Sequence, residues 1–300
     1  MTPLDRQALP AEPETLRNKV VVITGAGRGI GRAIAIVLAK KGARIAITSR
    51  TEAELHRTEE ELNEHGAEVL AAAGDVSSPI HVNEFVNKVI DTYGRIDVLV
   101  NNAGVLGPIG PIEENRADMW RYAIEVNLFG VFLLCKYVIP HMKRQRSGKI
   151  INFSGAGAPS PYPRFTAYSA SKTGVLGLTQ TLALELEDFN IQVNAVAPGI
   201  ADTRMQDEIL AAGESAGAAF AKAKEVKDGK GVELSKVAEL VAFLASDTSG
   251  GITGKYFSAR WDDWRGFTER SNMERLLASN IYTIQRIDEV FYRETKVRSR

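Results

Sequence analysis

Residues 20–42 of the 300-residue chain are VVVITGAGRGIGRAIAIVLAKKG, and this stretch decides the fold. The β-branched run from Val20 to Thr24 predicts a buried strand, and the apolar residues after Gly31 predict a helix that ends near Gly42. Between them stand alternating glycines, which let a backbone approach a pyrophosphate at a helix N-terminus. Strand, glycine turn and helix together predict a nucleotide-binding site, which a glycine-rich turn alone would not.

The alternation of strands and helices continues along the chain. We expect strands at 20–24, 43–48, 68–73, 96–101, 148–153 and 191–197, with a possible last strand near 253–258. Crossovers of helix length between strands predict a parallel sheet with helices on both faces, an α/β doubly wound (Rossmann) fold in a single domain. We assign residues 18–257 to that domain, 1–17 to an N-terminal lead, and 258–300 to a C-terminal extension packed on the domain or on a neighbouring subunit.

A tyrosine and a lysine four residues apart, in YSASK at 168–172, predict proton-transfer chemistry. Tyr168 and Lys172 would share one face of a helix. Because a nearby cation favours phenolate, Lys172 would bring the tyrosine pKa down from ~10 toward neutrality. Taken alone, the pair is more typical of a solvated helix face, and the proton-transfer interpretation depends on the other signals in the chain. Ser154 ends a predicted strand at the same sheet edge, and Asn127 is a polar residue within an apolar helix.

The residues after the second predicted strand bear on the choice of cofactor. NAD-binding folds usually place a carboxylate there to accept from the ribose 2′-hydroxyl, whereas this chain has Ser49 and Arg50. Arg28, in the glycine turn, can point the same way, and two guanidinium groups suit a 2′-phosphate. We therefore expect NADP(H) to be preferred, with NAD(H) possible; the alternative is that both arginines are ordinary surface residues.

Composition excludes several classes of function. Lys and Arg number 37 and Asp and Glu number 37, so the formal net charge of zero favours neither nucleic acid nor an anionic membrane as a partner. The polar N-terminus is unlike a signal peptide and we expect no bilayer-spanning run, which makes the cytoplasm the expected location. The single cysteine, Cys135, allows no disulfide within the chain, and the four scattered histidines predict no metal site.

Several short motifs occur in one order along residues 18–257. They are TGAGRGIG (24–31), GDV (74–76), NNAG (101–104), Asn127, Ser154, YSASK (168–172) and PG (198–199). In their order and spacing the chain resembles the short-chain dehydrogenase/reductase family, and within it the subtype of 3-oxoacyl-carrier-protein reductases and many sugar, steroid and xenobiotic carbonyl reductases. The extension departs from the family, whose members usually end soon after the last strand.

The resemblance implies roles for the four polar residues. Tyr168 would be the acid/base on the substrate oxygen, and Lys172 would hold the nicotinamide ribose. Ser154 would hydrogen-bond the substrate oxygen, and Asn127 would hold a water that links the lysine to solvent. The implied cofactor-binding residues are Gly25, Gly27, Arg28, Gly29, Ile30, Gly31, Ser49, Arg50, Asp75, Val76, Asn102, Ala103, Gly104, Tyr168, Lys172, Pro198, Gly199, Ile200 and Thr203. For Asn101 and Asn102 we favour the plainer interpretation that they pin neighbouring strands.

Three loops are expected to frame the substrate, at 105–115, 155–165 and 200–230. They are largely apolar, with Tyr162 and Phe165 as candidate walls and Arg164 and Arg204 as candidate anion partners. Within them, the Ala/Gly-rich stretch 209–223 predicts a mobile helix pair or lid. A hydrophobic or mixed carbonyl substrate is therefore favoured over a highly charged one.

These patterns predict an NADP(H)-dependent oxidoreductase that interconverts a small-molecule secondary alcohol and a ketone. One alternative is a 3-oxoacyl-carrier-protein reductase, which would need a basic docking patch; the nearest basic cluster in sequence is Lys143, Arg144 and Arg146. An alternative of another class is a non-catalytic dinucleotide sensor or scaffold on the same fold.

Apolar surfaces are also expected outside the cleft. Helices near 113–142 and 168–188 carry wide apolar stripes, and the resembled family often pairs such helices, so we expect a homodimer or homotetramer. Trp261, Trp264 and Phe267 follow the last strand, and we expect Trp261 or Trp264 to be buried against the cleft or a neighbouring subunit.

Overall fold

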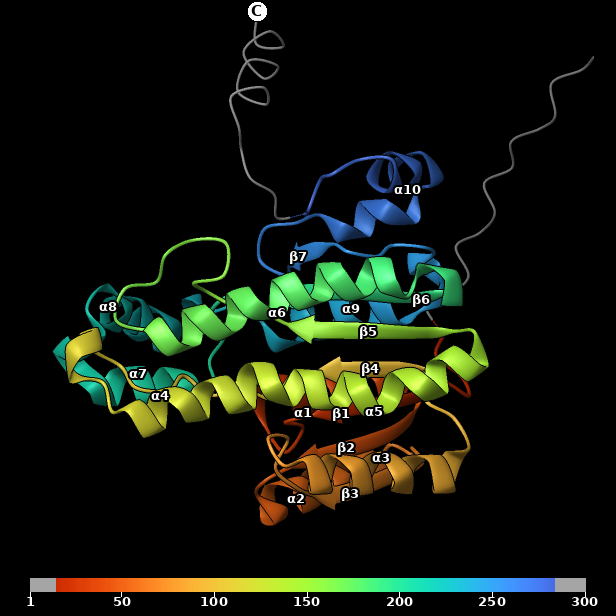
Figure 1. Ribbon diagram of the computed structural model, residues 1–300, viewed down its shortest axis with the longest axis horizontal. Helices are drawn as coiled ribbons and strands as arrows, with labels where there is room; N and C mark the ends of the chain where they lie inside the picture. Colours follow the sequence, from red (N-terminus) through yellow and green to blue (C-terminus); the bar gives the residue numbers. More distant parts are fainter. Residues whose placement is uncertain (1–14, 284–300) are drawn as a thin grey trace, which may run out of the picture.

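The computed structural model describes residues 15–283 and builds them around one parallel sheet (Figure 1). Its strands are β1 (Val20–Thr24), β2 (Arg44–Ser49), β3 (Val69–Ala73), β4 (Val98–Asn101), β5 (Gly148–Phe153), β6 (Ile191–Ala197) and β7 (Tyr256–Ser258). Their order in the sheet is β3-β2-β1-β4-β5-β6-β7. The strands β1 to β3 are added toward one side and β4 to β7 toward the other, so the order of addition reverses between the neighbours β1 and β4. This confirms the doubly wound fold, and β7 is the last strand that we expected near 253–258.

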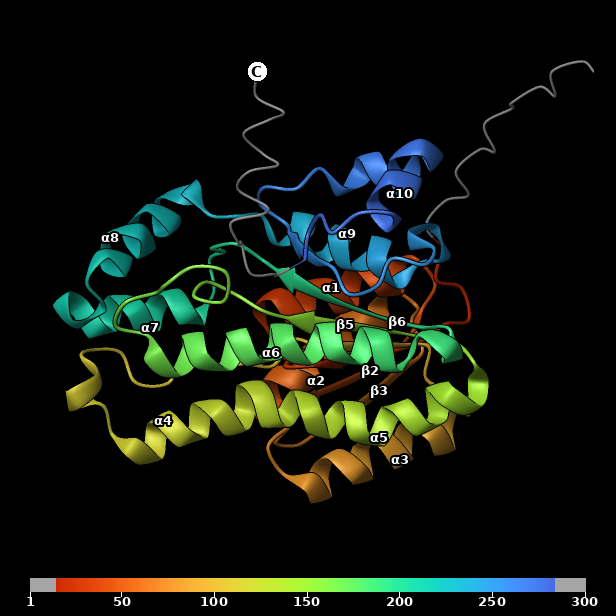
Figure 2. The ribbon, with the colours of Figure 1, turned by 45° about the horizontal axis from the view of Figure 1, so that its top comes forward.

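Helices cover both faces of the sheet (Figures 1 and 2). One face carries α1 (Gly29–Lys40), α2 (Glu52–Glu64) and α9 (Leu234–Ala245). The other carries α3 (Pro79–Tyr93), α4 (Ala117–Ile124), α5 (Gly130–Gln145) and α6 (Thr166–Glu185). Because both faces are covered, the central strands are apolar on both sides, as parallel strands usually are.

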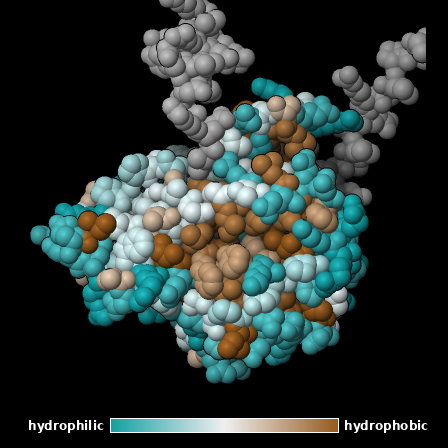
Figure 3. Space-filling view, viewed as in Figure 1, coloured by the Kyte–Doolittle hydropathy of each residue, from teal (hydrophilic) through white to brown (hydrophobic). Residues whose placement is uncertain are grey.

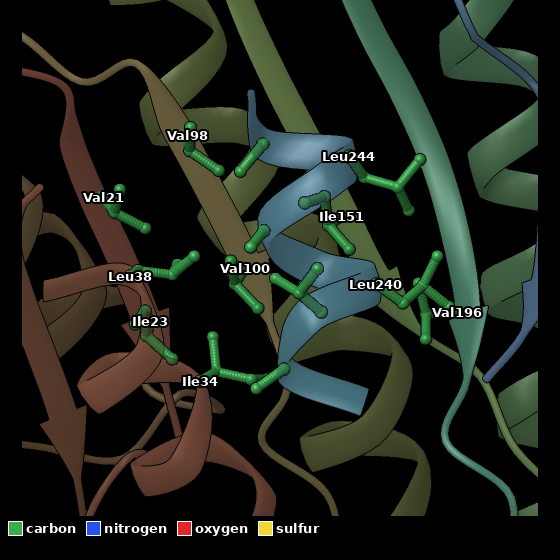
Figure 4. Close-up of a cluster of buried hydrophobic side chains, with 14 of the residues drawn as sticks. Val21, Ile23, Ile34, Leu38, Val98, Val100, Ile151, Val196, Leu240 and Leu244 are labelled. Carbon is green, nitrogen blue, oxygen red and sulfur yellow. The ribbon is translucent and has the colours of Figure 1, made fainter. Parts of the chain in front are cut away.

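The larger core lies between the sheet and the helices α1 and α9, as Figure 4 shows. Ile34 and Leu38 point inward from α1, and Leu240 and Leu244 point inward from α9. They meet strand residues of β1, β4, β5 and β6, namely Val21, Ile23, Val98, Val100, Ile151 and Val196. This packing holds the glycine turn before α1 at a fixed place on the sheet edge.

Helices α4 and α5 form one helical run, Ala117–Gln145, interrupted by a π-helical turn at Glu125–Phe129. Single π turns inside helices occur frequently at functional sites, and this one contains Asn127. We expected no run capable of spanning a bilayer, yet this one is long and apolar enough by length and composition. Half of its apolar window is buried inside the protein.

Two helices, α7 (Arg204–Ala212) and α8 (Ala218–Glu225), stand over the carboxyl end of the sheet. The expected helix pair is therefore present. Its apolar side forms a third, smaller cluster in which Ile209 and Ala219 are buried together with Phe165 and Tyr168. The pair thus covers the place where the catalytic tyrosine was predicted.

The C-terminal extension packs against α9 and β7 through a short helical turn at Trp264–Thr268 and the helix α10 (Arg270–Leu277). Trp264 is 2% exposed and its ring centre lies 5.5 Å from that of Phe243, whereas Trp261 is 76% exposed. Phe267 joins a ring cluster with Phe257 of β7.

The extension also satisfies the outer edge of β7. The amide of Tyr256 donates to the carbonyl of Tyr282 at 2.6 Å, and the amide of Ser258 donates to Asp262 Oδ2 at 2.6 Å. At the other end of the described chain Leu16 is fully buried in the core. Residues 1–14 of the predicted lead and 284–300 of the predicted extension lie outside the described residues.

Candidate active site

The glycine turn between β1 and α1 is pinned to β4 by Asn102. The Asn102 side-chain amide donates to the carbonyls of Thr24 at 2.9 Å and Gly25 at 3.2 Å. The Thr24 hydroxyl accepts in return from the amides of Asn102 at 3.1 Å and Ala103 at 3.0 Å. The strand-pinning interpretation of Asn102 is confirmed, and Asn101 likewise donates to Asn152 of β5 at 2.9 Å.

The turn has the shape that a dinucleotide requires. Gly25 has a φ of +65°, and a methyl group on Gly31 would overlap the Gly25 carbonyl, so neither position admits a side chain. Gly29 also has a positive φ, +55°, and a methyl group there would meet Thr203 of the α7 N-terminus at 3.5 Å. The first amides of α1 receive no side-chain cap. A pyrophosphate can therefore approach the backbone here and accept from those amides.

Arg28 of the glycine turn and Arg50 after β2 do not converge as expected. Arg28 forms an ion pair with Glu54 (2.8 Å between Nη1 and Oε1), and Arg50 instead donates to the hydroxyl of Tyr122 on α4. A methyl group on Gly27 would lie 3.1 Å from Glu54 Cβ, so this carboxylate borders the glycine turn. The sequence argument missed Glu54, although its place in the first turn of the helix after β2 was a usable signal. Arg50, which directly follows β2, has no carboxylate partner among residues 15–283.

Asp75 and Val76 lie beyond the end of β3. One carboxylate oxygen of Asp75 accepts from the amide of Ser77 at 2.9 Å and from its hydroxyl at 2.7 Å. The amide of Asp75 donates to His81 Nδ1 at 3.3 Å. These bonds fix the carboxylate and leave its second oxygen for another donor, such as an adenine amino group.

Tyr168, Lys172 and Ser154 meet where the carboxyl end of β5 faces the first turns of α6. All three are buried, and the Lys172 ammonium donates to the carbonyl of Phe153 at 2.9 Å. The Ser154 hydroxyl donates to the Lys172 carbonyl at 3.3 Å. A methyl group on Gly155 would overlap the Tyr168 hydroxyl, so the sequence Ser154–Gly155 runs directly beside the phenol. Gly155 was not predicted as a site residue.

Asn127 joins the same group from the π-helical turn. Its carbonyl oxygen accepts from the amide of Val105 at 2.8 Å. Its amide group donates to the Val105 carbonyl at 2.8 Å and to the Ser171 hydroxyl at 3.0 Å. Ser171 in turn donates to the Tyr168 carbonyl at 2.7 Å. A methyl group on Gly104 would lie 3.2 Å from Asn127 and 3.3 Å from the Lys172 ammonium. The structure thus brings all four predicted polar residues together and adds Ser171.

The ionisation of this cluster differs from the expectation. Burial raises the pKa of Tyr168 above its ordinary value, and burial lowers the pKa of Lys172 to about 8. The predicted depression of the tyrosine pKa by Lys172 is wrong for this arrangement. The ammonium lies 5.8 Å from the centre of the phenol ring and is directed to the Phe153 carbonyl, so desolvation outweighs charge attraction.

The end of β6 completes the cofactor side of the cleft. Gly199 has a φ of +75°, and a methyl group there would meet side-chain atoms of Val232 at 2.7 Å and Arg260 at 3.2 Å. The Ile200 carbonyl accepts from the amide of Val232 at 2.8 Å. The loop after β6 thus carries Pro198–Gly199 and also Thr203, which approaches Gly29 of the glycine turn.

Tyr162 and Phe165, the two aromatic residues predicted to line the substrate cleft, differ in their burial. Tyr162 is half-buried and stacks on Phe165 with 4.3 Å between ring centres, whereas Phe165 is fully buried beneath the helix pair. Phe165 is therefore core rather than wall. Arg164 is exposed and has a φ of +74°, and its carbonyl accepts from the Gly110 amide at 2.9 Å, which ties two substrate loops together. Arg204 is the first residue of α7.

Two features of the sequence lie outside the site chemistry. Cys135 is buried in α5, and burial raises the pKa of its thiol to about 12, which makes it a packing residue. Within residues 15–283 no three His, Cys, Asp or Glu side chains gather in a way that would hold a metal ion.

The chain matches known dehydrogenases over most of its length. The family described as short chain dehydrogenase matches residues 19–213. The chain is 38% identical over 240 residues to a 3-oxoacyl-acyl-carrier-protein reductase of Thermotoga maritima, covering 80% of this chain and 95% of that one.

Two solved structures bear on the cofactor. An NAD⁺-bound xylitol dehydrogenase is 30% identical with a TM-score of 0.76, covering 81% of this chain and 98% of that one. A variant of actinorhodin polyketide ketoreductase with NADPH is 35% identical with a TM-score of 0.74, covering 80% and 95%.

The chain belongs to the short-chain dehydrogenase/reductase family. It is an NAD(P)-dependent oxidoreductase of that family.

Proposed function

We propose that this protein interconverts a secondary alcohol and a ketone with NADP(H), using Tyr168 as the general acid/base. The observation that carries the proposal is the meeting of Ser154, Gly155 and the Tyr168 hydroxyl at one buried point, with Lys172 behind them. A non-catalytic sensor does not require a buried lysine and a buried phenol at the same place, because burying both has a cost in stability.

Each residue has a task that its contacts support. Tyr168 would give its proton to the substrate oxygen in reduction, and Ser154 would donate a second hydrogen bond where negative charge develops. Lys172 would bind a ribose hydroxyl, and Asn127 holds Ser171 and so the backbone at Tyr168. The bound nicotinamide would supply the hydride. Its ribose and pyrophosphate would be held by the glycine turn, Gly104 and Thr203.

The preference for NADP(H) rests on Arg50. Its guanidinium donates to Tyr122 and lies 5.7 Å from that ring centre, so it is held near the end of β2. Within residues 15–283 its other N–H groups have no carboxylate partner and can bind a phosphate. Arg28 contributes less than expected, because Glu54 neutralises it. We therefore propose a preference for NADPH that Arg50 carries and Glu54 limits.

An apolar or mixed carbonyl compound is the substrate class that the cleft favours. Leu106 from the loop after β4 and Ile209 from α7 share one buried cluster with Tyr168, so the space next to the phenol is apolar. The second candidate, a 3-oxoacyl-carrier-protein reductase, is supported by the Thermotoga maritima relative. The basic cluster expected to dock the carrier protein does not support this candidate. Arg146 precedes the amino end of β5, whereas Ser154 follows the carboxyl end of the same strand.

The remaining expectations stay proposals. We propose a cytoplasmic homodimer or homotetramer that acts on a small molecule, with neither nucleic acid nor membrane as a partner. The apolar face of α5 and α6 that supports the assembly is visible in Figure 3.

A panel of ketones and secondary alcohols, assayed with NADPH and with NADH, tests the proposal. We expect turnover of at least one apolar ketone, and a loss of at least ~10²-fold in kcat for Tyr168→Phe, the usual scale for a general acid. Cofactor affinity should be unchanged in that variant, because the phenyl ring remains. A Tyr168→Phe enzyme with the kcat of the wild type would show that the assigned mechanism is wrong.

A further inference from the structure

Tyr256, the first residue of β7, lies on the sheet face that carries α6. The strand register pairs Asn152 with Ala195, and Ala195 with Tyr256. Laterally paired residues of a sheet point to the same face, so these three side chains are neighbours. Asn152 identifies the face, because its amide donates at 2.9 Å to the hydroxyl of Thr179 on α6.

The phenol of Tyr256 reaches the catalytic serine across β6. Ser154 follows Asn152 by two residues, so its hydroxyl points to the same face, one step nearer the carboxyl edge. Ala195 stands between them with only a methyl group, and the Tyr256 ring lines a small cavity beside Ala195 and Leu176. Ser154 lies close enough to the Tyr256 phenol to act on its pKa, which the serine lowers.

Two properties make Tyr256 a fixed donor. Burial and the nearby Asp262 raise the pKa of the Tyr256 phenol to about 12, so it keeps its proton at neutral pH. Its backbone is held by the extension, since its amide donates to Tyr282 at 2.6 Å and the neighbouring Lys255 ammonium donates to Ser279 at 2.5 Å.

We propose that Tyr256 is a positioning residue that donates to the oxygen of Ser154 and so directs the serine proton to the substrate oxygen. A serine hydroxyl has one proton, and in the present arrangement that proton is given to the Lys172 carbonyl. A donor on its oxygen polarises the hydroxyl and strengthens the bond that it makes in turn. The inference rests on the proposed role of Ser154, and it links the extension to catalysis.

A double-mutant cycle separates this role from a structural one. Tyr256→Phe removes only the hydroxyl, and we expect kcat to fall roughly three- to tenfold, the scale of one neutral hydrogen bond, with the melting temperature and the cofactor Kd unchanged. In the Ser154→Ala background the same substitution should change kcat less than about twofold, because its target is gone. Tyr93→Phe is the matched control: a half-buried tyrosine at the end of α3, beside Glu68 and Arg44 at the opposite edge of the sheet.

The outcomes are distinguishable. Equal losses in both backgrounds, or no loss in the wild-type background, overturn the positioning role and leave the proposed function intact. If Ser154→Ala itself leaves kcat unchanged, the role of Ser154 in the proposed function fails, and this inference fails with it. A loss for Tyr256→Phe that is accompanied by a lower melting temperature and persists without Ser154 assigns Tyr256 to packing alone.

Discussion

Lys172 is an ammonium group that the fold removes almost completely from water, with the Phe153 carbonyl as its hydrogen-bond acceptor. Its pKa falls to about 8 from 10.5 because the charged form loses hydration. Below pH 8 the lysine is protonated in both the folded and the unfolded chain. Between pH 8 and 10.5 the unfolded chain binds more protons, so stability rises with pH in that interval.

We therefore expect the free energy of unfolding of the cofactor-free protein to rise between pH 8 and pH 10, by roughly 3 kcal/mol at most from this group. Urea denaturation at several pH values measures the slope, and Lys172→Met should reduce it. Tyr168 has the opposite effect on the free energy of unfolding, and only above pH 10. Burial raises the pKa of its phenol, so above pH 10 the unfolded chain has lost this proton while the folded chain keeps it, and stability falls as pH rises. An identical slope in Lys172→Met would contradict the assignment.

Arg50 and Glu54 act in opposite senses on the cofactor. Arg50→Ala should weaken NADPH binding by about one to two orders of magnitude and leave NADH binding unchanged, because it removes a charge-assisted contact with the 2′-phosphate. Glu54→Gln should tighten NADPH binding several-fold by releasing Arg28 from its ion pair. Ser49→Asp with Arg50→Ala should erase or reverse the preference.

Dissociation constants for both cofactors at one ionic strength decide the matter. Arg57→Ala on α2 is the control, since its side chain bonds only to the Ala53 carbonyl of its own helix among the residues the structure describes. Tighter binding of NADH than of NADPH by the wild-type protein would refute the preference.

Single residues show which parts of the site a sequence reveals. Tyr168, Lys172, Ser154 and Asn127 were recognisable because their spacing and their position after strands are local properties. The partners of the arginines were not, because Glu54 is 26 residues from Arg28 and Tyr122 is 72 from Arg50. The pKa of Tyr168 was predicted in the wrong direction, since burial under α7–α8 is a property of the tertiary structure.

Among the elements, the strands were predicted within a few residues because buried parallel strands are apolar runs bounded by turn residues. The predicted strand 43–48 is found at Arg44–Ser49, and 96–101 begins two residues later, at Val98. The π-helical turn at Glu125–Phe129 was not predictable, because a single inserted residue leaves no clear mark on helical periodicity. Nor did the sequence show which tryptophan of the extension is buried.

Those two tryptophans provide a prediction at the scale of the extension. Trp264→Ala should lower the free energy of unfolding by about 3–5 kcal/mol, because it empties a buried site beside Phe243. Trp261→Ala, three residues earlier and 76% exposed, should change it by less than ~0.5 kcal/mol. Denaturant unfolding of both variants measures the two changes in free energy, and equal effects would contradict the different burial of the two tryptophans.

On the scale of the whole molecule, an apolar face over α5 and α6 is exposed among residues 15–283. Figure 3 shows apolar residues gathered over α5 and α6 in the centre of the view. Phe129 and Phe132 are 40% and 43% exposed and stack with 5.6 Å between ring centres, and Leu184 on α6 is 77% exposed. Patches of this kind on a folded protein mark interaction surfaces.

We expect a closed two-fold assembly through this face, and Phe132→Glu should convert it to a monomer. The physical reason is that a carboxylate at the centre of an isologous interface is buried twice without a partner. Light scattering at micromolar concentration measures the mass, and Ile80→Glu, at a 68% exposed position on α3, is the control. A monomeric wild-type protein under those conditions would contradict the assembly.

The bonds from Tyr282 and Asp262 to β7 have a consequence for solubility. Without these bonds the outward amides of Tyr256 and Ser258 would be unpaired donors on an edge strand, which could pair with a strand of another molecule. The extension caps this exposed edge of the sheet by accepting hydrogen bonds from both amides. A chain shortened to Ala259 should therefore precipitate through intermolecular strand pairing in addition to being less stable, and charged substitutions placed along β7 should restore its solubility without restoring its melting temperature.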